Sequence, residues 1–210
     1  MFDLGGEARL VALTLYTDAH IVRGTLQTRQ RRVSDMLNTA EDDFLVLSDV
    51  VFDEFGSSGQ PLRAEFAQVN LGAVLFGVAD EAVEAVAELR TPKVAERALI
   101  SIPPFRVVGR IHVLAERGLR EALQELSGRF VPVTDAMYWS DSVGEARTNA
   151  VMVAVNRSRA QILAPHRETD PWQGLDRATD ETARPPAGGF EEAEPQARVH
   201  SVWGDIDRIG

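Results

Sequence analysis

Apolar and polar residues alternate in short runs along the N-terminal part of the chain. Residues 9–16 read Arg-Leu-Val-Ala-Leu-Thr-Leu-Tyr, and Thr17-Asp18-Ala19 can then turn the chain into a second run at 21–28. Such alternation, with many β-branched residues, is typical of a half-buried β-hairpin. Further strands are predicted at 44–52, 62–69 and 73–78.

A short helix is predicted between the second and third of these strands. Ser34 suits the N-cap position of residues 35–38, and Asp35 in the first turn faces the positive end of the helix dipole. Five short strands and one helical turn in about 70 residues favour a small Sm-like β-barrel. We expect Met36 and Leu37 to plug the end of that barrel.

The order of these features repeats after an offset of 85 or 86 residues. Each copy has a strand with a glycine, a short helical segment, a strand that begins with Phe and ends in Ser/Thr-Asp, and a strand that closes with Val-Asn. The superposed pairs are Gly24 and Gly109, Phe44 and Phe130, Asp49 and Asp135, and Asn70 and Asn156. We therefore predict an internal duplication, with Phe44 and Phe130 buried at equivalent positions.

The second copy supplies the remaining strands. Its first strand meets Pro103-Pro104, which cannot continue a ladder and so marks a turn. Between the copies, Val83, Val86 and Leu89 recur at helical spacing with glutamates on the other side, which predicts a connecting helix. The strands of the second copy are predicted at 98–102, 130–139, 149–155 and 160–163.

The chain is therefore predicted to be mostly β, with two tandem small Sm-like β-barrel units joined by a short helix. We expect the units at 7–78 and 93–164, the linking helix at 79–92 and an extended acidic arm at 165–210. Each unit is close to the lower size limit for an independent core, so packing one against the other would stabilise both.

The motifs of the first unit resemble a group of small bacterial domains of unknown function. In that group a strand pair is followed by a Leu-Ser-Asp-Leu-Leu-Asn-like turn, a strand ending in Leu-Thr-Asp and a closing Val-Asn strand. The matching stretches here are residues 33–38, 44–49 and 69–70, with a degraded second copy of the turn at 119–124. The resemblance covers most of the body but not the arm, and it implies no activity. The degraded copy lacks the Ser-Asp and Asn of the turn, so a site built on them would exist once.

Composition narrows the classes of function. The 210 residues carry a net charge of -10, whereas nucleic-acid binding needs a basic footprint, so we predict no nucleic-acid partner. The chain has no cysteine, which excludes disulfides, thiolate metal sites and Fe–S clusters. No window approaches the roughly 18 apolar residues of a membrane-spanning helix, and residues 1–7 do not read as a signal peptide. We expect a cytoplasmic protein that does not insert into a membrane. Attachment to the cytoplasmic face of a membrane complex is the alternative location.

The arm at 165–210 concentrates acidic residues and proline. It holds ten Asp or Glu against five Arg, a composition that does not support an independent core. Two segments nevertheless place tryptophan beside glycine and aliphatic residues, and tryptophan is a frequent interface anchor. We predict that the arm docks onto a protein partner through these side chains; the alternative is that they pack on the chain's own barrels. The anchor candidates are Trp172, Leu175, Trp203 and Ile206.

A basic cluster precedes the predicted helix. Arg29, Arg31 and Arg32 lie together in the sequence, with Arg23 nearby. In an acidic chain such a cluster can bind an acidic protein surface or an anionic head group, and these three arginines are candidate partner-binding residues. The alternative is a solvated hairpin tip.

Residues that commonly carry catalysis do not converge in the sequence. The four histidines, His20, His112, His166 and His200, lack zinc-type spacing, and the acidic run at 41–43 lacks the glycine and alternate ligands of a calcium loop. None of the glycine-rich segments has the strand–helix context or the lysine of a phosphate loop. We therefore predict no metal and no organic cofactor.

The recurring polar residues have structural interpretations. We expect Asp49 and Asp135 to cap turns at the ends of equivalent strands rather than to form an acid–base pair. Asn70 and Asn156 are expected to bridge neighbouring strands through their amides. An enzyme using Asp49, Asp135 or His112 is the least favoured class because nothing in the sequence brings these groups together.

These observations favour a non-catalytic adaptor or accessory subunit. It would dock onto a larger protein assembly through its C-terminal arm, with peripheral attachment to a membrane complex left open. The alternative is a ligand-sensing or regulatory module with its pocket between the two barrels.

Overall fold

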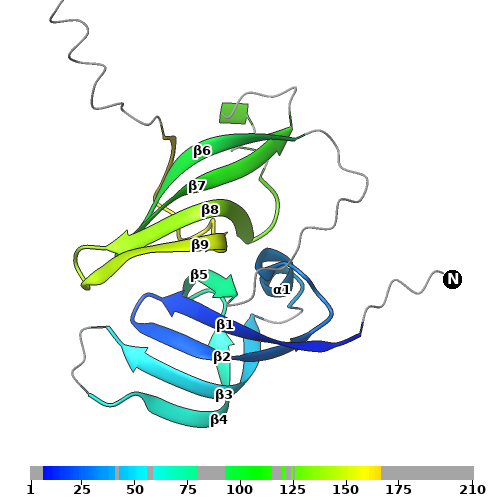
Figure 1. The fold of residues 1–210 in the computed structure, drawn as a ribbon, viewed down its shortest axis with the longest axis vertical. Helices are drawn as coiled ribbons and strands as arrows, with labels where there is room; N and C mark the ends of the chain where they lie inside the picture. Colours follow the sequence, from blue (N-terminus) through cyan, green and yellow to red (C-terminus); the bar gives the residue numbers. More distant parts are fainter. Residues whose placement is uncertain are drawn as a thin grey trace, which may run out of the picture. The chain divides into compact units, whose positions relative to one another are not determined.

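A computed structural model gives the fold of the body of the chain (Figure 1). The residues it describes are 7–40, 43–55, 59–79, 93–114, 120–121, 124 and 126–166. Within them, ten antiparallel strands form one sheet and the mostly β class is confirmed. Residues 80–92 of the predicted linking helix and residues 167–210 of the predicted arm lie outside the described residues, while Ala79 belongs to a strand and not to a helix.

The sheet divides into two halves of like construction. The N-terminal half (9–79) contains β1 (Arg9–Thr17), β2 (His20–Thr28), α1 (Val33–Asn38), β3 (Phe44–Glu54), β4 (Leu62–Asn70) and β5 (Val74–Ala79). The C-terminal half (93–165) contains β6 (Lys93–Ile102), β7 (Phe105–Leu114), β8 (Phe130–Ser140), β9 (Glu145–Asn156) and β10 (Ile162–Pro165). Every predicted strand overlaps one of these elements, and Pro103-Pro104 forms the predicted turn between β6 and β7.

Strand order is the same in both halves. The N-terminal half runs β5-β1-β2-β3-β4 and the C-terminal half runs β10-β6-β7-β8-β9. The halves are joined where β5 pairs with β9, which leaves β4 and β10 as the two edges of the sheet (Figure 1). We call this contact the β5–β9 junction.

Strand register shows the duplication pair by pair. Wherever the ladders of both halves are formed, each paired residue of β1 and β2 has its counterpart 85 residues later. Each paired residue of β3, β4 and β5 has its counterpart 86 residues later. Corresponding pairs include Leu15↔Gly77 with Ile100↔Leu163, Thr25↔Ser48 with Arg110↔Thr134, and Phe44↔Asn70 with Phe130↔Asn156. The predicted internal repeat is confirmed.

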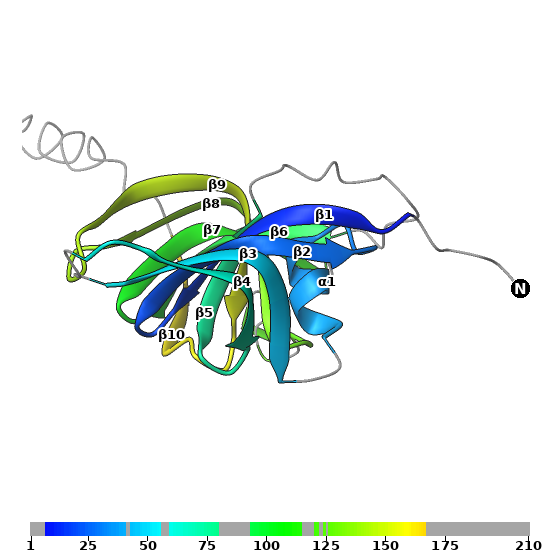
Figure 2. The ribbon, with the colours of Figure 1, turned by 90° about the horizontal axis from the view of Figure 1, so that it is seen from below.

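The recurring Gly and Asp build a bulge in each half. Asp49 and Asp135 lie within β3 and β8, at φ of 52° and 47°, so the prediction that they end strands and cap turns was wrong. Left-handed backbone is better tolerated by Asp than by most residues. The register of the neighbouring strand shifts at Gly24 and at Gly109, and the strands curve along their length (Figure 2). The Gly–Asp pair therefore bends the strands of each half.

The helix differs in its start from the prediction. α1 begins at Val33 with Arg32 at the N-cap, and no side chain caps it, so the role predicted for Ser34 was wrong. Ser34 is instead buried on the inner face of the helix. Met36 and Leu37 are buried in the core of the N-terminal half, and the expectation that they plug the end of a barrel stays a prediction. Among the described residues, no helix has both the length and the apolarity needed to cross a membrane.

Two hydrophobic cores interlock across the halves. The core of the C-terminal half includes Tyr16, Leu75 and Phe76 from the N-terminal half. The core of the N-terminal half in turn includes Phe130 and Ala154. Each half therefore completes its core with side chains of the other, as the size argument requires.

The sheet itself is open. No ladder among the described strands joins β4 to β5 or β9 to β10, so the sheet is not closed into a barrel. The finer expectation of two Sm-like barrels stays a prediction. The boundary predicted at 164/165 falls inside a strand, because Pro165 pairs with Ala98 at the end of β10.

Candidate functional site

Phe130 packs across the junction, whereas its counterpart Phe44 is exposed. Phe130 is fully buried, at 0% relative exposure, within the core of the N-terminal half. Phe44 holds the same ladder position in its own half but is 48% exposed, so its predicted burial was wrong. The difference arises because Phe130 has a neighbouring half to pack into and Phe44 has none among the described residues.

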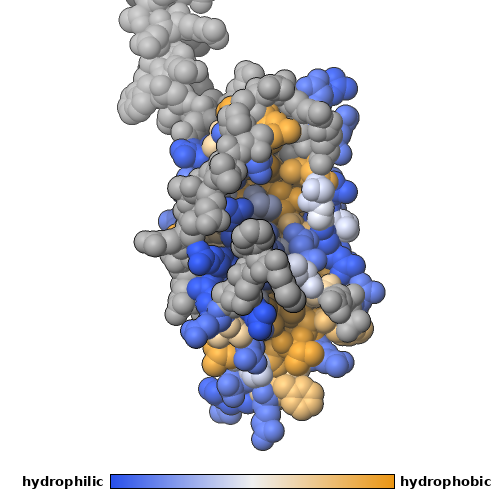
Figure 3. Space-filling model, turned by 90° about the vertical axis from the view of Figure 1, so that its right-hand side faces the viewer, coloured by the Kyte–Doolittle hydropathy of each residue, from blue (hydrophilic) through white to orange (hydrophobic). Residues whose placement is uncertain are grey.

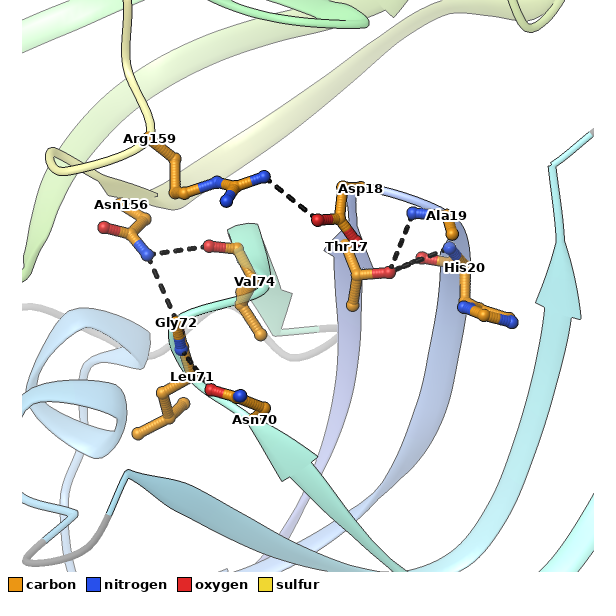
Figure 4. Close-up of polar contacts among 10 residues, drawn as sticks. All are labelled: Thr17, Asp18, Ala19, His20, Asn70, Leu71, Gly72, Val74, Asn156 and Arg159. Atoms are coloured by element: carbon orange, nitrogen blue, oxygen red, sulfur yellow. Dashed lines mark hydrogen bonds and ion pairs between the residues drawn. The ribbon is translucent and has the colours of Figure 1, made fainter.

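The asparagine that pairs with each phenylalanine differs in the same way. Asn156 is buried, and its Nδ2 donates to the carbonyls of Leu71 (3.2 Å) and Val74 (2.8 Å) across the junction (Figure 4). Asn70 is exposed; its Oδ1 accepts from the N–H of Gly72 at 2.8 Å, and no partner of its Nδ2 is recorded in the described part of the chain. The predicted bridging role holds for Asn156 alone.

Asn38 fastens the helix to the same phenylalanine. Its Oδ1 accepts from the backbone N–H of Phe130 and its Nδ2 donates to the carbonyl of Phe130, both at 2.8 Å. An amide that meets both backbone groups of one residue continues the ladder like an additional strand residue. An ion pair between Arg159 and Asp18, at 3.0 Å, also joins the two halves (Figure 4).

An aromatic cluster fills the other side of the junction. The chain has two tyrosines, Tyr16 and Tyr138, and their hydroxyl oxygens lie 3.0 Å apart in the core. Tyr16 stacks on Phe76 at 4.4 Å between ring centroids and meets Phe105 edge-on at 5.3 Å. Burial, and then the hydrogen bond to Tyr138, raise the pKa of Tyr16 far above its usual range, and burial raises the pKa of Tyr138. Sequence reasoning missed this pair, although their being the chain's two tyrosines was a usable signal.

Large apolar side chains are exposed on the outer face of β3 and β4, at the free edge of the N-terminal half. Ser48 on β3 faces Phe66 on β4, which places Phe66 on the same face as Phe44 and Val46. Orange side chains lie at the surface in the lower part of Figure 3, the region where Figure 1 places β3 and β4. We call the exposed residues Phe44, Val46 and Phe66 the β3–β4 patch.

The C-terminal half covers the residues that match Phe44 and Phe66. Phe44 corresponds to Phe130, and Phe66 corresponds to Met152, which packs against the core of the N-terminal half. The same face of the same two strands is therefore a packed interface in one half and an open surface in the other. This contrast was not visible in the sequence.

The predicted arginine cluster is a surface feature. Arg29, Arg31 and Arg32 are exposed in the segment between β2 and α1, and within the described residues no ion pair is recorded for them. The guanidinium of Arg9 donates to the carbonyls of Gln30 and Arg31, which fixes the segment. Arg23 does not join the cluster because it pairs with Asp53 at 3.0 Å. The arrangement leaves the three arginines available to an acidic surface.

The titratable residues are dispersed. His20 meets the Phe52 ring edge-on, His112 bonds the Thr134 hydroxyl at 2.8 Å, and the backbone N–H of His166 donates to Arg97. Asp135 pairs with Arg110 at 3.1 Å in one half, while Asp49 lies in the other. Within the described residues, no group of three or more His, Cys, Asp or Glu is placed to hold a metal ion. His200 lies outside those residues.

One small hollow is present in the C-terminal half. It has a volume of about 120 Å³ beside the β6–β7 turn, where Arg106 pairs loosely with Asp141 at 3.7 Å. Arg147 covers the Trp139 ring at 5.1 Å nearby. The place where the alternative hypothesis put a pocket, between the halves, is occupied by the aromatic cluster and by Phe130.

The arm residues predicted to bind partners lie outside the described residues. Their role in binding is untested by the structure, and so is that of the arginine cluster. The candidates in the arm are Trp172, Leu175, Trp203 and Ile206.

Comparison with known proteins adds no family. No family model, no curated protein and no solved structure matches the chain. The resemblance of its motifs to small bacterial domains therefore stays a prediction.

Proposed function

We propose that the chain is a non-catalytic adaptor or accessory subunit that docks onto a larger protein assembly. The observation that supports this is the exposed β3–β4 patch, because clustered exposed aromatic side chains beside an open strand edge are features of binding surfaces. Each half acts as one small barrel-like unit, and the two form the rigid body of the adaptor. We place it in the cytoplasm, with the face of a membrane complex as the alternative location.

The C-terminal arm is the second binding element. Trp172 and Trp203 each stand beside glycine and are followed by Leu175 and Ile206, in a segment of net charge -5. Such a segment can order on binding, with the tryptophans as anchors. Arg29, Arg31 and Arg32 add a positive surface for an acidic partner.

The ligand-sensing alternative is less well supported. It places a pocket between the halves, where Tyr16, Phe76, Phe105 and Tyr138 pack against one another. A ligand there would have to displace the core. The packing therefore favours the adaptor over the sensor.

Truncation after His166 tests the arm. The cut keeps Pro165 in β10, and the comparison is between the full chain and the truncated chain in the native host. We expect the proteins that co-purify with the full chain to be lost and the melting temperature of the body to stay unchanged. The combined Trp172→Ala and Trp203→Ala variant should reproduce the loss, whereas Phe190→Ala, a matched aromatic control outside the two motifs, should not.

Two results would count against this proposal. If truncation lowers the melting temperature and leaves association intact, the arm packs on its own body. If every variant co-purifies the same proteins, the arm does not bind partners.

A further inference from the structure

We propose that copies of this chain associate head to tail, with β4 of one copy pairing with β10 of the next. The contact would repeat between chains the β5–β9 junction that joins the halves within a chain. The inference assigns the β3–β4 patch, which also supports the adaptor proposal, to a second copy of this chain. The C-terminal arm plays no part in it, so the truncation that tests the arm and the mass measurement below can fail separately.

The two free edges are the counterparts of the two paired strands. β9 corresponds to β4 at an offset of 86 residues, and β5 corresponds to β10 at the same offset. Within the chain β5 and β9 pair, while β10 and β4 are left at the edges. Each molecule therefore exposes two strands, β4 and β10, whose counterparts already pair with each other in the β5–β9 junction.

The internal ladder fixes the register of the proposed one. The junction pairs Phe76↔Val155, Gly77↔Ala154 and Val78↔Val153. Applying the offset to both strands gives Ile162 opposite Val69, Leu163 opposite Gln68, and Ala164 opposite Ala67. Pro165 corresponds to Ala79, one residue beyond the last pair of the junction, so the proline does not remove an N–H that the new ladder would need.

Side chains around β4 are exposed where their counterparts are covered. Phe44 and Phe66 are exposed, while Phe130 is buried and Met152 packs against the neighbouring half. The Nδ2 of Asn70 has no recorded partner in the described part of the chain, while that of Asn156 donates twice across the junction. A second copy would cover both phenylalanines and offer Asn70 the carbonyls of Arg157 and Ala160, the counterparts of Leu71 and Val74.

The proposed contact is weaker than the internal one. Tyr16 and Phe76 of the junction correspond to the smaller Ser101 and Ile162, so less apolar area would be buried. The Arg159–Asp18 ion pair corresponds to Ala73 and Pro103, which cannot form one. We therefore expect association that depends on protein concentration.

The contact is heterologous, because two different edges meet. Repeating it yields a closed ring when the rotation from copy to copy closes, and an open chain when it does not. A ring pairs every β4 and β10 edge, whereas an open chain leaves one of each unpaired at its ends, and an unpaired edge is open to nonspecific strand pairing.

The mass of the full-length protein in solution tests the proposal. We expect light scattering after size-exclusion chromatography to give multiples of 23.0 kDa that increase with concentration. Phe44→Glu should return the protein to one copy. Val151→Glu is the matched control: Val151 is 66% exposed on the paired strand β9, at the position where β4 already carries Glu65, and the change should leave the mass unaltered. Unchanged circular dichroism would show that both variants fold.

Engineered cysteines test the register, because the chain has none of its own. A chain carrying Ala67→Cys and Ala164→Cys should form disulfide-linked dimers and larger species on oxidation. Replacing the second change by Gln161→Cys moves that thiol by roughly 10 Å along the strand, beyond the reach of a disulfide, and should abolish them. A protein of one copy at all concentrations, or equal cross-linking by both cysteine pairs, would overturn the proposal.

Discussion

Phe44 and Phe130 lie opposite equivalent asparagines in two matching ladders, yet one is 48% exposed and the other is completely buried. Local strand pairing is the same at both positions. Only the neighbour differs, since Phe130 enters the core of the N-terminal half. The two halves thus share one paired interface, the β5–β9 junction, and the corresponding surfaces on β4 and β10 are unpaired.

Loss of the amide of Asn156 should destabilise the body. Asn156→Ala leaves the carbonyls of Leu71 and Val74 without their donor inside the junction, so we expect a decrease of about 1–3 kcal/mol in the free energy of unfolding. Asn70→Ala removes only an exposed turn contact and should cost about 0.5 kcal/mol or less. Urea denaturation of both variants measures the difference; equal losses would show that the junction does not depend on Asn156.

The bulge glycines should tolerate a methyl group unequally. A Cβ on Gly109 would lie 2.5 Å from Cγ1 of Val133 and 2.9 Å from the carbonyl oxygen of Thr134. A Cβ on Gly24 would meet its nearest atoms at 3.1 Å. We expect Gly109→Ala to cost about 1–3 kcal/mol, the usual range for overpacking, and Gly24→Ala to cost less. Thermal melts of the two variants give the order, and a larger loss for Gly24→Ala would contradict it.

Alkaline pH should destabilise the fold through the tyrosine pair. The folded pKa values of Tyr16 and Tyr138 are raised, so the unfolded chain loses phenolic protons above pH of about 10 that the folded chain keeps. The stabilising contribution is fully present below that pH and is lost as the pH rises. If both phenols stay protonated in the fold, the slope approaches about 2.7 kcal/mol per pH unit well above pH 10.

The two tyrosines also provide the measurement. Tyrosinate absorbance should stay low until the chain unfolds, and then both groups should ionise together. The double variant Tyr16→Phe and Tyr138→Phe should lack this steep dependence. Ionisation of either phenol near pH 10 in a chain that is still folded would contradict the assigned burial.

Much of the strand layout was predictable from the sequence. Alternation located the strands to within a few residues, and the recurrence of Phe, Asp and Val-Asn predicted the duplication that the ladders confirm. These signals are local, and a strand repeats its pattern wherever it packs. The predicted roles of Ser34 and Asp49 failed because capping preferences do not indicate which side of a short helix is buried or where a strand bulges.

The candidate site was not predictable because it depends on contacts between the halves. Phe44 and Phe130 each begin a strand with a run of apolar residues, and Asn70 and Asn156 each follow a valine at the end of a strand. These shared patterns do not indicate which member of each pair is buried. Burial at these positions depends on strand β5 reaching β9, a pairing between residues about 80 apart in the chain. The chain has only two tyrosines, one in each half, and this was the one feature of the composition that could have suggested a contact between the halves.

Amide hydrogen exchange along β4 is the sharpest test of head-to-tail association. The segment Leu62–Asn70 is an edge strand in one copy and a paired strand in the head-to-tail assembly. We predict that its exchange slows as the protein concentration of the full chain rises, together with that of Ile162–Pro165, while Val151→Glu behaves like the unaltered protein and Phe44→Glu exchanges fast throughout. Fast exchange of both edges at every concentration would exclude the pairing of β4 with β10 of another copy.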